Sequence, residues 1–439
     1  MRTRRIAIHM PTSLSGIASK ARRDKAARFG NLCQMLSEDN LRWCFYQLRK
    51  TSAAGVDGVT FRDYEGNLEE NLSDLVERLK GNRYRAKLVR RKHIPKSGGK
   101  TRPLGIPALE DKLLQSACAK VLTAIYEEDF LDCSWGYRRK RSAREASRVL
   151  ASELYRGRYG WVVEADIKGF FNHIDHDWMV KMLEQRVADK AFIRLIQKWM
   201  KAGILEESMK VVHPATGTPQ GGIISPVLAN IYLHYVIDLW FEKVIQKGCR
   251  GQACIMRYAD DFVCGFEHRQ EAEHFVRSLS QRLGKFGLEV APEKTRTLPF
   301  SRFKPEPNDS FEFLGFEFRW VKRRTGKMGV DRTTAPGRLR NSMLAFTRWI
   351  KENRNRRIAT IMEKVAQKLR GYWNYYCVRG NYENLCRLYR HCKRALIKWL
   401  NRRSQKRSYT VQGAQEMLLH YNLPEPRITE PRYQPVLSI

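Results

Sequence analysis

Two adjacent acids between two β-favouring runs restrict the fold more than any other feature of the chain. They lie in CIMRYADDFVCGF, residues 254–266, where apolar and β-favouring residues surround a short break. This pattern predicts a β-hairpin with Asp260 and Asp261 at its tip. A merely solvated turn would favour Asp-Gly or Asn-Gly, because a tight hairpin needs a positive φ that two Asp residues supply poorly. A bound divalent cation would remove the repulsion between the carboxylates, since Mg²⁺ is held by one or two carboxylates and substrate phosphates.

A third carboxylate is predicted at the end of another strand. In WVVEADIKGFF, residues 161–171, Asp166 closes an apolar run, where an acid is costly unless it is paired or metal-bound. Glu164 lies on the same face of such a strand and is the competing candidate, with a structural salt bridge as its alternative role. Asp166 together with the two hairpin acids would supply the three carboxylates that two-metal phosphoryl transfer needs.

Two further stretches fit a triphosphate substrate. In VRRKHIPKSGGKTRPLGIP, residues 89–107, Lys96 and Arg102 lie on either side of a Ser-Gly-Gly turn, so a hairpin could aim two cations and several backbone N–H groups at phosphates. In GTPQGGIISPVLANIYLH, residues 217–234, a loop of small residues leads into a helix, and so little side chain lets a nucleic-acid strand approach closely. The position of this loop between the two acidic strands strengthens an otherwise weak signal.

The charge of the chain points to a polyanion. Lys and Arg number 81 against 46 acids, a formal net charge of +35, and such an excess is self-repelling unless a partner such as nucleic acid offsets it. An anionic membrane is the alternative, but no run of ~18 apolar residues is present. The basic start lacks a signal-peptide core, and ten scattered Cys without CxxC favour reduced thiols over a zinc site. We therefore expect a cytoplasmic protein without a membrane partner.

Three amphipathic helices are predicted from Pro336 to about Arg403. In the last of them one face is apolar and basic residues lie largely off it. A solvated face is the alternative, but the charge of the whole chain favours nucleic-acid binding. The candidate RNA-binding residues are Arg387, Arg390, Lys393, Arg394 and Lys398.

The motifs, taken in order, resemble the successive blocks of a reverse transcriptase, specifically the bacterial group II intron-encoded kind. The blocks are RRKHIPKSGGKTRPLGIP, VVEADIKGFFNHIDH, GTPQGGIISPVLANIYL, MRYADDFV, GLEVAPEKT and FEFLGF. They cover roughly residues 31 to 320, and the stretch to about residue 403, with LRGYWNYY, resembles the maturase or thumb domain of those proteins.

This resemblance implies an α+β fold of the right-hand polymerase type, with an antiparallel palm sheet and a helical thumb. The expected domains are a basic N-terminal extension (1–30), fingers (31–155), a palm (156–320), a thumb or maturase domain (333–403) and a C-terminal tail (404–439).

The resemblance also assigns the site. It makes Asp166, Asp260 and Asp261 the catalytic metal ligands and adds Ile167 to the metal-binding set. It places the substrate contacts at Lys96, Arg102, Phe170, Phe171, Gln220 and Lys294.

Each of these substrate contacts has an expected role. Lys96 and Arg102 would bind the triphosphate, and Gln220 would lie near the template or the incoming nucleotide. Phe171 lies where such polymerases hold an aromatic gate against the ribose 2′-OH, and Phe170 would point the other way on an extended strand. Core packing is the alternative for both rings. Lys294 either supports the acids or is solvated.

The implied reaction is attack of a primer 3′-OH on the α-phosphate of a dNTP, assisted by two Mg²⁺ ions with Mn²⁺ as a substitute. The implied partners are an RNA template, including the protein's own intron RNA, a DNA or RNA primer, and dNTPs. The oligomeric state stays open. The alternatives are a freestanding reverse transcriptase of DNA repair or phage defence, and an RNA-binding splicing factor with a vestigial polymerase site. The intact acids argue against the vestigial site.

Some residues depart from the family pattern. No paired Cys or His follows Arg403, so we expect the endonuclease-lacking type. SWGYRRKRSAREA replaces a SYGFRP-like stretch, and Trp135 and Arg139 change the expected fingers contact. In NHIDH, His173 and His176 around Asp175 invite a metal interpretation, but a turn-stabilising role is favoured.

Overall fold

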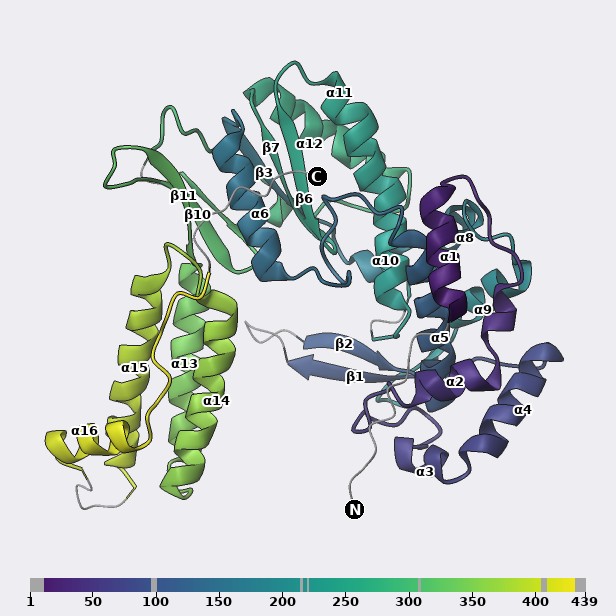
Figure 1. The fold of residues 1–439 in the computed structure, drawn as a ribbon, viewed down its shortest axis with the longest axis horizontal. Helices are drawn as coiled ribbons and strands as arrows, with labels where there is room; N and C mark the ends of the chain where they lie inside the picture. The colour runs from purple at the N-terminus through teal and green to yellow at the C-terminus, as the bar shows by residue number, and fades with distance from the viewer. Residues whose placement is uncertain are drawn as a thin grey trace.

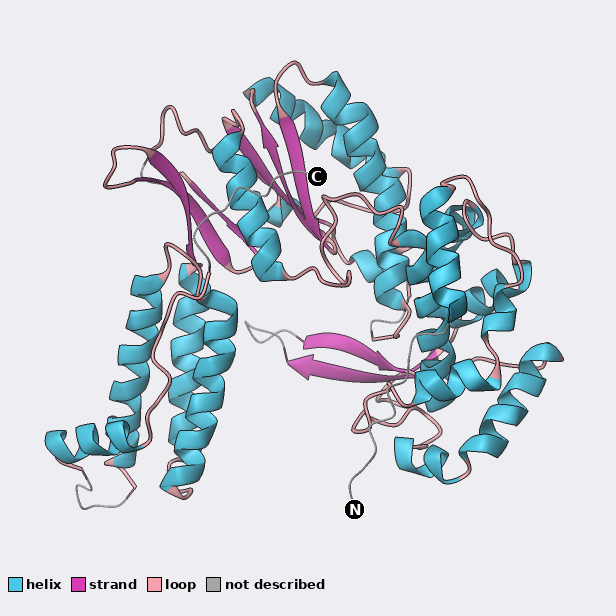
Figure 2. Cartoon of the chain, viewed as in Figure 1, coloured by secondary structure: helices cyan, strands magenta, loops and turns pink. Residues whose placement is uncertain are grey.

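The computed structural model describes residues 12–95, 101–213, 216–218, 221–306, 309–403 and 409–430. Figure 1 shows two helical lobes on either side of an opening, with a β-sheet and its helices joining them above. The described strands form three sheets, which are antiparallel apart from one pair (Figure 2). The α+β class expected from the sequence is therefore confirmed.

The amino-terminal lobe is built around helix α5 (Leu109–Tyr126), which is buried along most of its length. The helices that surround it include α1 (Thr12–Arg23), α2 (Glu38–Phe45), α3 (Phe61–Gly66), α4 (Leu68–Lys80), α8 (His176–Glu184) and α9 (Lys190–Met200). Helix α1 is basic, yet it contacts α5 closely, because Leu14 and Ala21 are buried and Arg22 forms an ion pair with Glu128. The amino-terminal stretch thus contributes a docked helix from Thr12 onward.

A long hairpin extends from this lobe into the opening (Figure 1). Strands β1 (Val89–Pro95) and β2 (Thr101–Ile106) pair antiparallel, and the short β4 (Ile204–Leu205) and β5 (Val211–Val212) complete a sheet of order β2-β1-β4-β5. The hairpin predicted around the Ser-Gly-Gly stretch is confirmed, and the turn itself lies outside the described residues.

The central sheet has the order β6-β7-β3-β8, with all neighbours antiparallel. Its strands are β3 (Trp161–Asp166), β6 (Ala253–Tyr258), β7 (Asp261–Phe266) and β8 (Arg296–Pro299). Side chains alternate between two cores: Phe262 and Cys264 pack into the core that contains α12 (Arg269–Gly284), whereas Val263 packs into the core that contains α6 (Ala143–Arg156). Because both faces are covered, strands β3, β6 and β7 are mostly apolar, whereas the edge strand β8 is partly exposed.

Several shorter or irregular helical segments lie between Phe170 and Lys294. They are α7 (Phe170–His173), the run of α10 (Ser225–Leu233), two π-helical segments (His234–Asp238 and Phe241–Ile245) and α11 (Gln246–Gly248), and a 3₁₀ turn (Pro292–Lys294). Within the part of the chain that the structure describes, no helix combines the length and the apolar composition needed to span a lipid bilayer.

The carboxyl-terminal lobe begins with a second antiparallel sheet, formed by β9 (Ser310–Phe313), β10 (Phe316–Lys322) and β11 (Met328–Thr334). The three helices predicted from Pro336 onward are present as α13 (Pro336–Asn353), α14 (Ile358–Tyr376) and α15 (Tyr382–Leu400). They bury one apolar face each around Ile350, Val365 and Leu396.

Residues 421–430, here called the C-terminal strap, follow the short helix α16 (Val411–His420) and run back along the helical lobe toward the central sheet (Figure 1). The indole N–H of Trp373 donates to the carbonyl of Pro424 (2.9 Å). At the end of the strap, Glu430 accepts two hydrogen bonds from Arg332 of β11 (both 2.6 Å). Nothing in the sequence pattern of the tail indicated this docking.

Candidate active site

The hairpin and strand β3 bring the three acids together. Asp166, the last residue of β3, is the register partner of Asp261, the first residue of β7. Tyr258 is paired with Asp261 across the hairpin, so Ala259 and Asp260 alone form a two-residue turn. The expectation that both acids occupy the tip is therefore wrong for Asp261. The positive φ that a tight hairpin requires falls on Ala259 (58°), which leaves both acids in ordinary backbone conformations.

The electrostatics of the three acids favour bound cations. Partial desolvation, followed by the charges of Asp166 and Asp260, raises the pKa of Asp261 to about 7, although its side chain opens onto the cleft. Desolvation is also the main cause that raises the pKa of Asp260, with a further contribution from Asp166. The Lys294 ammonium group donates to Asp166, and this hydrogen bond raises the pKa of Lys294. Lys294 thus offsets part of the negative charge of the cluster.

Glu164 is engaged in structure. It lies on the same strand as Asp166 but is buried, and Arg296 of β8 donates to it at 2.6 Å. It also accepts a hydrogen bond from the backbone N–H of Glu312 (2.6 Å), which ties β3 to β9. The structural salt bridge considered for Glu164 is therefore what the structure contains.

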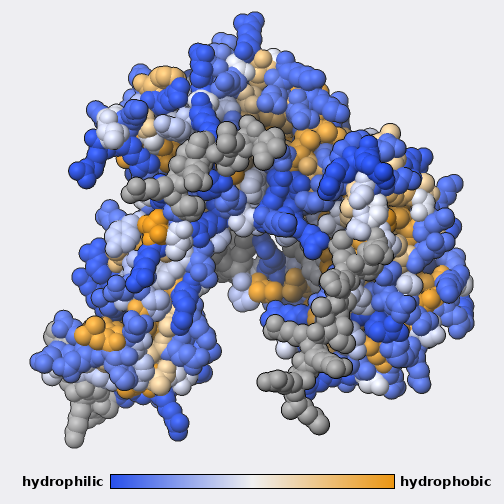
Figure 3. Space-filling model, in the orientation of Figure 1, coloured by the Kyte–Doolittle hydropathy of each residue, from blue (hydrophilic) through white to orange (hydrophobic). Residues whose placement is uncertain are grey.

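The acids open onto a cleft of 940 Å³. Its lining combines the three acids with basic, aromatic, aliphatic and glycine residues, among them Arg102, Tyr137, Ile167, Phe171, Gly221, Gly222, Lys294 and Arg338. Arg102 lies on β2, and its positive charge lowers the pKa of Asp260. This effect opposes the rise that desolvation and Asp166 cause. Lys96 and Gln220 lie outside the described residues. Figure 3 shows that the surface around the opening is largely hydrophilic on the side in view.

Phe170 and Phe171 lie on a helical turn, and the expectation of an extended strand is wrong. Strand β3 ends at Asp166, and Gly169 adopts a left-handed conformation (φ 56°) that starts α7. Phe170 is 1% exposed and its ring lies 6.3 Å from that of Tyr232, so it belongs mainly to the core. Phe171 is half-buried at the wall of the cleft, and its carbonyl accepts from the N–H of Thr218 in the glycine-rich loop (2.8 Å).

The residues of NHIDH stabilise turns, as the sequence favoured. Asp175 caps α8 by accepting from the N–H of Trp178 (2.9 Å). His176 Nε2 lies 2.6 Å from the carbonyl oxygen of Gly217, and His173 Nδ1 lies 3.0 Å from that of Gly169. Both imidazoles are thus engaged by backbone groups, which leaves the three Asp residues as the candidate ligands.

The three acids fit a hard divalent cation by the chemistry of their oxygen donors. Across the described residues, no three His, Cys, Asp or Glu side chains stand as a ready metal-binding group. Desolvation and then the neighbouring carboxylates raise the pKa of Asp261, and Lys294, which contacts one oxygen of Asp166, compensates only part of this effect. Cations would replace this partial compensation with direct neutralisation.

Two residues at the cleft were not indicated by the sequence. Tyr137 has a positive φ (60°) and lies within SWGYRRKR, the stretch that departs from the family pattern. Arg338 comes from the first turn of α13 and reaches the same cleft from the opposite lobe. No local motif marks Arg338, because it follows Asp166 by 172 residues and the two hairpin acids by 77 and 78 residues. Only the folded arrangement reveals it.

The basic face of α15 is exposed. Arg387, Arg390, Arg394 and Lys398 are solvent-exposed, and Lys393 is half-buried with its ammonium 4.7 Å from the centre of the Tyr389 ring. Among the described residues, the ion pairs with acids include none of these five side chains. A face of one sign without acidic partners is open to a polyanion.

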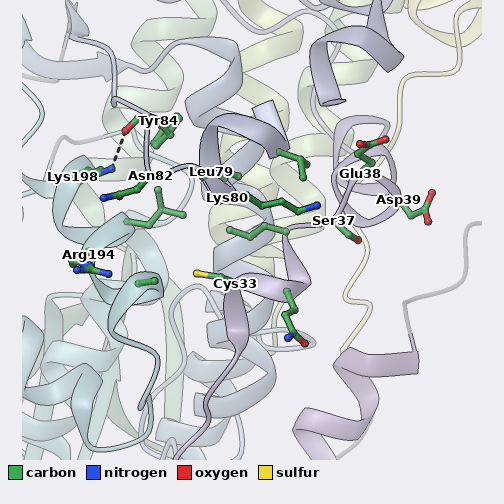
Figure 4. A pocket seen from close by; sticks show the side chains of 15 residues that line it. Cys33, Ser37, Glu38, Asp39, Leu79, Lys80, Asn82, Tyr84, Arg194 and Lys198 are labelled. Atoms are coloured by element: carbon green, nitrogen blue, oxygen red, sulfur yellow. Dashed lines mark hydrogen bonds between the residues drawn. The ribbon is translucent and has the colours of Figure 1, made fainter. Parts of the chain in front are cut away.

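A second cavity, of 570 Å³, lies between α2, α4 and α9 and shares no lining residue with the cleft (Figure 4). Its wall mixes apolar side chains with charged ones, and the ammonium of Lys198 donates to the carbonyl of Tyr84 (2.8 Å). Burial, followed by the charge of Asp189, raises the pKa of the Cys33 thiol to about 12. This thiol is therefore protonated at neutral pH and is a packing group there.

Comparison with known proteins agrees with the geometry. Residues 94–318 match the family model described as "Reverse transcriptase (RNA-dependent DNA polymerase)", and residues 344–416 match "Group II intron, maturase-specific domain". Protein YkfC of Escherichia coli is 31% identical over 369 residues, which cover 75% of this chain and 94% of that protein. Group II intron-encoded protein LtrA of Lactococcus lactis is 39% identical over 208 residues, covering 47% of this chain and 34% of LtrA.

The putative COX1/OXI3 intron 1 protein of Saccharomyces cerevisiae is 25% identical over 427 residues, which cover 80% of this chain and half of that protein. The first family model alone spans more than half of the chain, and it includes β3, β7 and the turn before β7, which together carry the three acids. The chain belongs to the reverse transcriptase family, as an RNA-directed DNA polymerase joined to the maturase-specific domain of group II intron-encoded proteins.

Proposed function

We propose that this protein extends a primer 3′-OH with dNTPs on an RNA template and binds group II intron RNA as a splicing maturase. The observation that carries the proposal is the meeting of Asp166, Asp260 and Asp261 at one end of the central sheet, in a cleft with basic residues around it. The intron RNA, the primer and the dNTPs are the partners that these features fit.

The proposed architecture is that of a right hand. The fingers would correspond to residues 31–155, the palm to 156–320 and the thumb to 333–403, with the amino-terminal extension (1–30) and the tail (404–439) at the two ends. The two lobes across the opening and the sheet between them support this division (Figure 1).

Reverse transcriptases act with divalent metal ions, and we assign two Mg²⁺ ions, replaceable by Mn²⁺, to Asp166, Asp260 and Asp261. When bound, such ions lower the pKa of the attacking hydroxyl and neutralise charge on the phosphoryl group. Ile167 is 2% exposed and apolar, so only its backbone carbonyl can serve as a ligand. Lys294 holds the Asp166 carboxylate in place at the end of β3.

The side chains of the cleft position the substrate. Arg102 faces the acids from β2, where its guanidinium is suited to bind the triphosphate. Lys96 and Gln220 remain assigned to the triphosphate and to the template or incoming nucleotide. Gly221 and Gly222 offer a backbone without side chains at the wall that a nucleic-acid strand would approach.

Phe171 is proposed as the gate against the ribose 2′-OH, with Phe170 as its support in the core. Replacing Phe171 by Ala should admit ribonucleotides, because the half-buried ring at the wall of the cleft would no longer occupy the space of the hydroxyl. The dNTP-over-rNTP ratio of kcat/KM should fall by roughly tenfold or more. Phe170→Leu is the matched control, and it should lower stability while preserving selectivity. Unchanged selectivity in Phe171→Ala would show that the Phe171 ring serves core packing and does not exclude the 2′-OH.

The exposed basic face of α15 is proposed to bind RNA phosphates. Changing Arg387, Arg390 and Arg394 to Glu should weaken the binding of structured RNA. The slope of log K against log[salt] should become shallower by about two to three, because each lost phosphate contact releases roughly one counterion fewer. Fluorescence anisotropy over a salt series measures this slope.

Reversal of three exposed basic residues elsewhere, Arg62, Arg277 and Lys285, serves as the control for net charge. These residues lie on α3, on α12 and just after α12. The control variant has the same charge change, so equal loss of slope in both variants would show that α15 has no special part in RNA binding.

The proposed reaction is tested by primer extension. Purified protein should extend a DNA primer on an RNA template when Mg²⁺ and dNTPs are present, and EDTA should stop extension without releasing the RNA. Absence of extension at every Mg²⁺ and Mn²⁺ concentration would remove the polymerase proposal and leave RNA binding as the function.

A further inference from the structure

Arg257 contacts the two-residue turn of Ala259 and Asp260. Its side chain is fully buried, and each of its N–H donors has a hydrogen-bond acceptor. Its side chain is 0% exposed, and its Nε and one Nη donate to the two carboxylate oxygens of Asp238 (2.6 Å each). The other bonds go to the side chains of Asn230 (3.2 Å) and Ser134 (2.7 Å) and to the carbonyl of Ala259 (3.0 Å). A guanidinium has five N–H donors in a fixed fork, so this environment is matched to Arg and not to Lys.

The bond to Ala259 acts on the backbone that carries Asp260. The accepting oxygen belongs to the peptide that joins Ala259 to Asp260, and Ala259 is the residue with φ of 58°. A residue with a Cβ adopts this conformation at a cost, and it persists where the surroundings hold it. Arg257 therefore fixes the orientation of the peptide plane that leads into a catalytic acid.

A second segment closes the turn from the other side. The backbone N–H of Arg257 donates to the carbonyl of Cys133, and the N–H of Trp135 donates to the carbonyl of Arg257 (both 2.8 Å). A Cβ on Gly136 would lie 2.4 Å from the backbone nitrogen of Ala259, so only glycine fits there. Asn230 also donates to the carbonyl of Gly136 (2.7 Å). The turn is thus packed between the Arg257 side chain and the segment from Cys133 to Gly136. Arg257 and Asn230 are both hydrogen-bonded to this segment.

The acid that pairs with Arg257 is placed by an unusual helix. Asp238 is 0% exposed and ends the first π-helical segment, eight residues after Asn230. In a regular α-helix two such residues would point ~80° apart. The wider π turns bring both side chains to the same guanidinium, and π turns of this kind are frequent at functional sites. The helix that begins after the glycine-rich loop thereby connects to the catalytic hairpin.

We propose that Arg257, held by Asp238, is a positioning residue for polymerisation: it fixes the Ala259–Asp260 peptide so that the Asp260 carboxylate meets Asp166 and Asp261. Neither Arg257 nor Asp238 lines the cleft, so the pair acts through the turn alone. The proposal rests on the proposed catalytic role of Asp260 and adds the device that orients it.

The competing explanation is that this ion pair serves stability only. Breaking any buried pair by removing one partner destabilises a protein strongly, so a loss of stability alone says nothing about positioning. Arg186 offers a matched control, because it is 3% exposed, pairs with Asp129 (3.1 Å) and donates to the carbonyl of Ala21 (3.2 Å), all outside the cleft.

The experiment compares Arg257→Lys, Arg257→Met and Asp238→Asn with Arg186→Lys and Arg186→Met. Single-nucleotide addition is measured over a Mg²⁺ series, at a temperature where thermal melting shows each protein to be folded. For the Arg257 and Asp238 variants kcat should fall by roughly 10- to 100-fold, as expected for a misplaced catalytic group. The Mg²⁺ concentration at half-maximal rate should rise, while RNA affinity and the KM for dNTP stay within about twofold.

The outcomes separate the possibilities. If the Arg186 variants lose as much stability but keep kcat and the Mg²⁺ dependence of the wild type, positioning by Arg257 is supported. If folded Arg257→Lys also keeps both quantities, the pair is structural and the proposal is overturned. Should Arg257→Met not fold, the Lys and Asn variants decide by the same criteria. A wild type that adds no nucleotide would instead refute the proposed polymerase function itself.

Discussion

Asp260→Asn and Asp261→Asn are expected to lose most primer extension on an RNA template, by roughly a thousandfold or more in rate. Each change keeps the size of the side chain but removes a negative charge from the cluster that Asp166 completes. With fewer carboxylates, the site should bind the proposed cations too weakly for them to neutralise the developing charge of the phosphoryl group.

The same substitutions should leave the rest of the protein intact. RNA affinity should be unchanged, because the basic face of α15 lies on another lobe. The melting temperature of the metal-free protein should not fall, since one of three mutually repelling carboxylates is removed. Glu289→Gln, which changes an exposed acid paired with Lys168, is the control and should retain activity. Extension by either Asn variant at the wild-type rate would contradict the assigned site.

Arg332→Met is expected to be the most destabilising change in the carboxyl-terminal lobe, by about 3–5 kcal/mol. Arg332 of β11 is 5% exposed and bonds both oxygens of Glu430 (2.6 Å) and the hydroxyl of Ser147 on α6 (3.0 Å). Removing the guanidinium leaves the Glu430 carboxylate buried without its cation. Arg144 of α6 donates to the hydroxyl of the neighbouring Thr429 (2.8 Å) and to the carbonyl of Cys377 at the end of α14 (3.1 Å), so the strap connects the carboxyl-terminal lobe with α6 of the central sheet.

Denaturant unfolding and limited proteolysis of the strap measure this effect. Arg323→Met breaks a half-exposed pair with Asp331 on the same sheet and should change stability by less than about 1 kcal/mol. The double variant Arg332→Met with Glu430→Met should recover much of the loss, because no unpaired charge remains. Equal effects of Arg332→Met and Arg323→Met would show that the strap contributes nothing to the attachment of the carboxyl-terminal lobe to α6.

The short-range parts of the site could be predicted from the sequence. The hairpin around Asp260 and the strand that ends at Asp166 follow from β-favouring runs of a few residues, and the pairing of these strands brings the acids together. The apolar stripe of α15 likewise follows from helical spacing, and Leu385, Leu388 and Leu396 are buried as that spacing requires.

The remainder depends on contacts that no local pattern contains. The positive φ of Ala259 is held by Arg257, whose own partner Asp238 lies 19 residues earlier on a π-helical segment. Glu430 is bound by a residue 98 positions away, so the tail shows no periodic pattern although it docks. The helical turn at Phe171 depends on the left-handed conformation of Gly169, which a strand pattern does not reveal.

The most direct test measures primer extension and RNA affinity on the same preparations of the wild-type protein and of Asp260→Asn. We expect the wild type to extend a primer with Mg²⁺ and dNTPs, and the variant to bind the RNA with the same affinity but to extend almost none of it. A variant that extends as well as the wild type, or a wild type that binds RNA without extending any primer, would contradict the assignment of the three acids as the polymerase site.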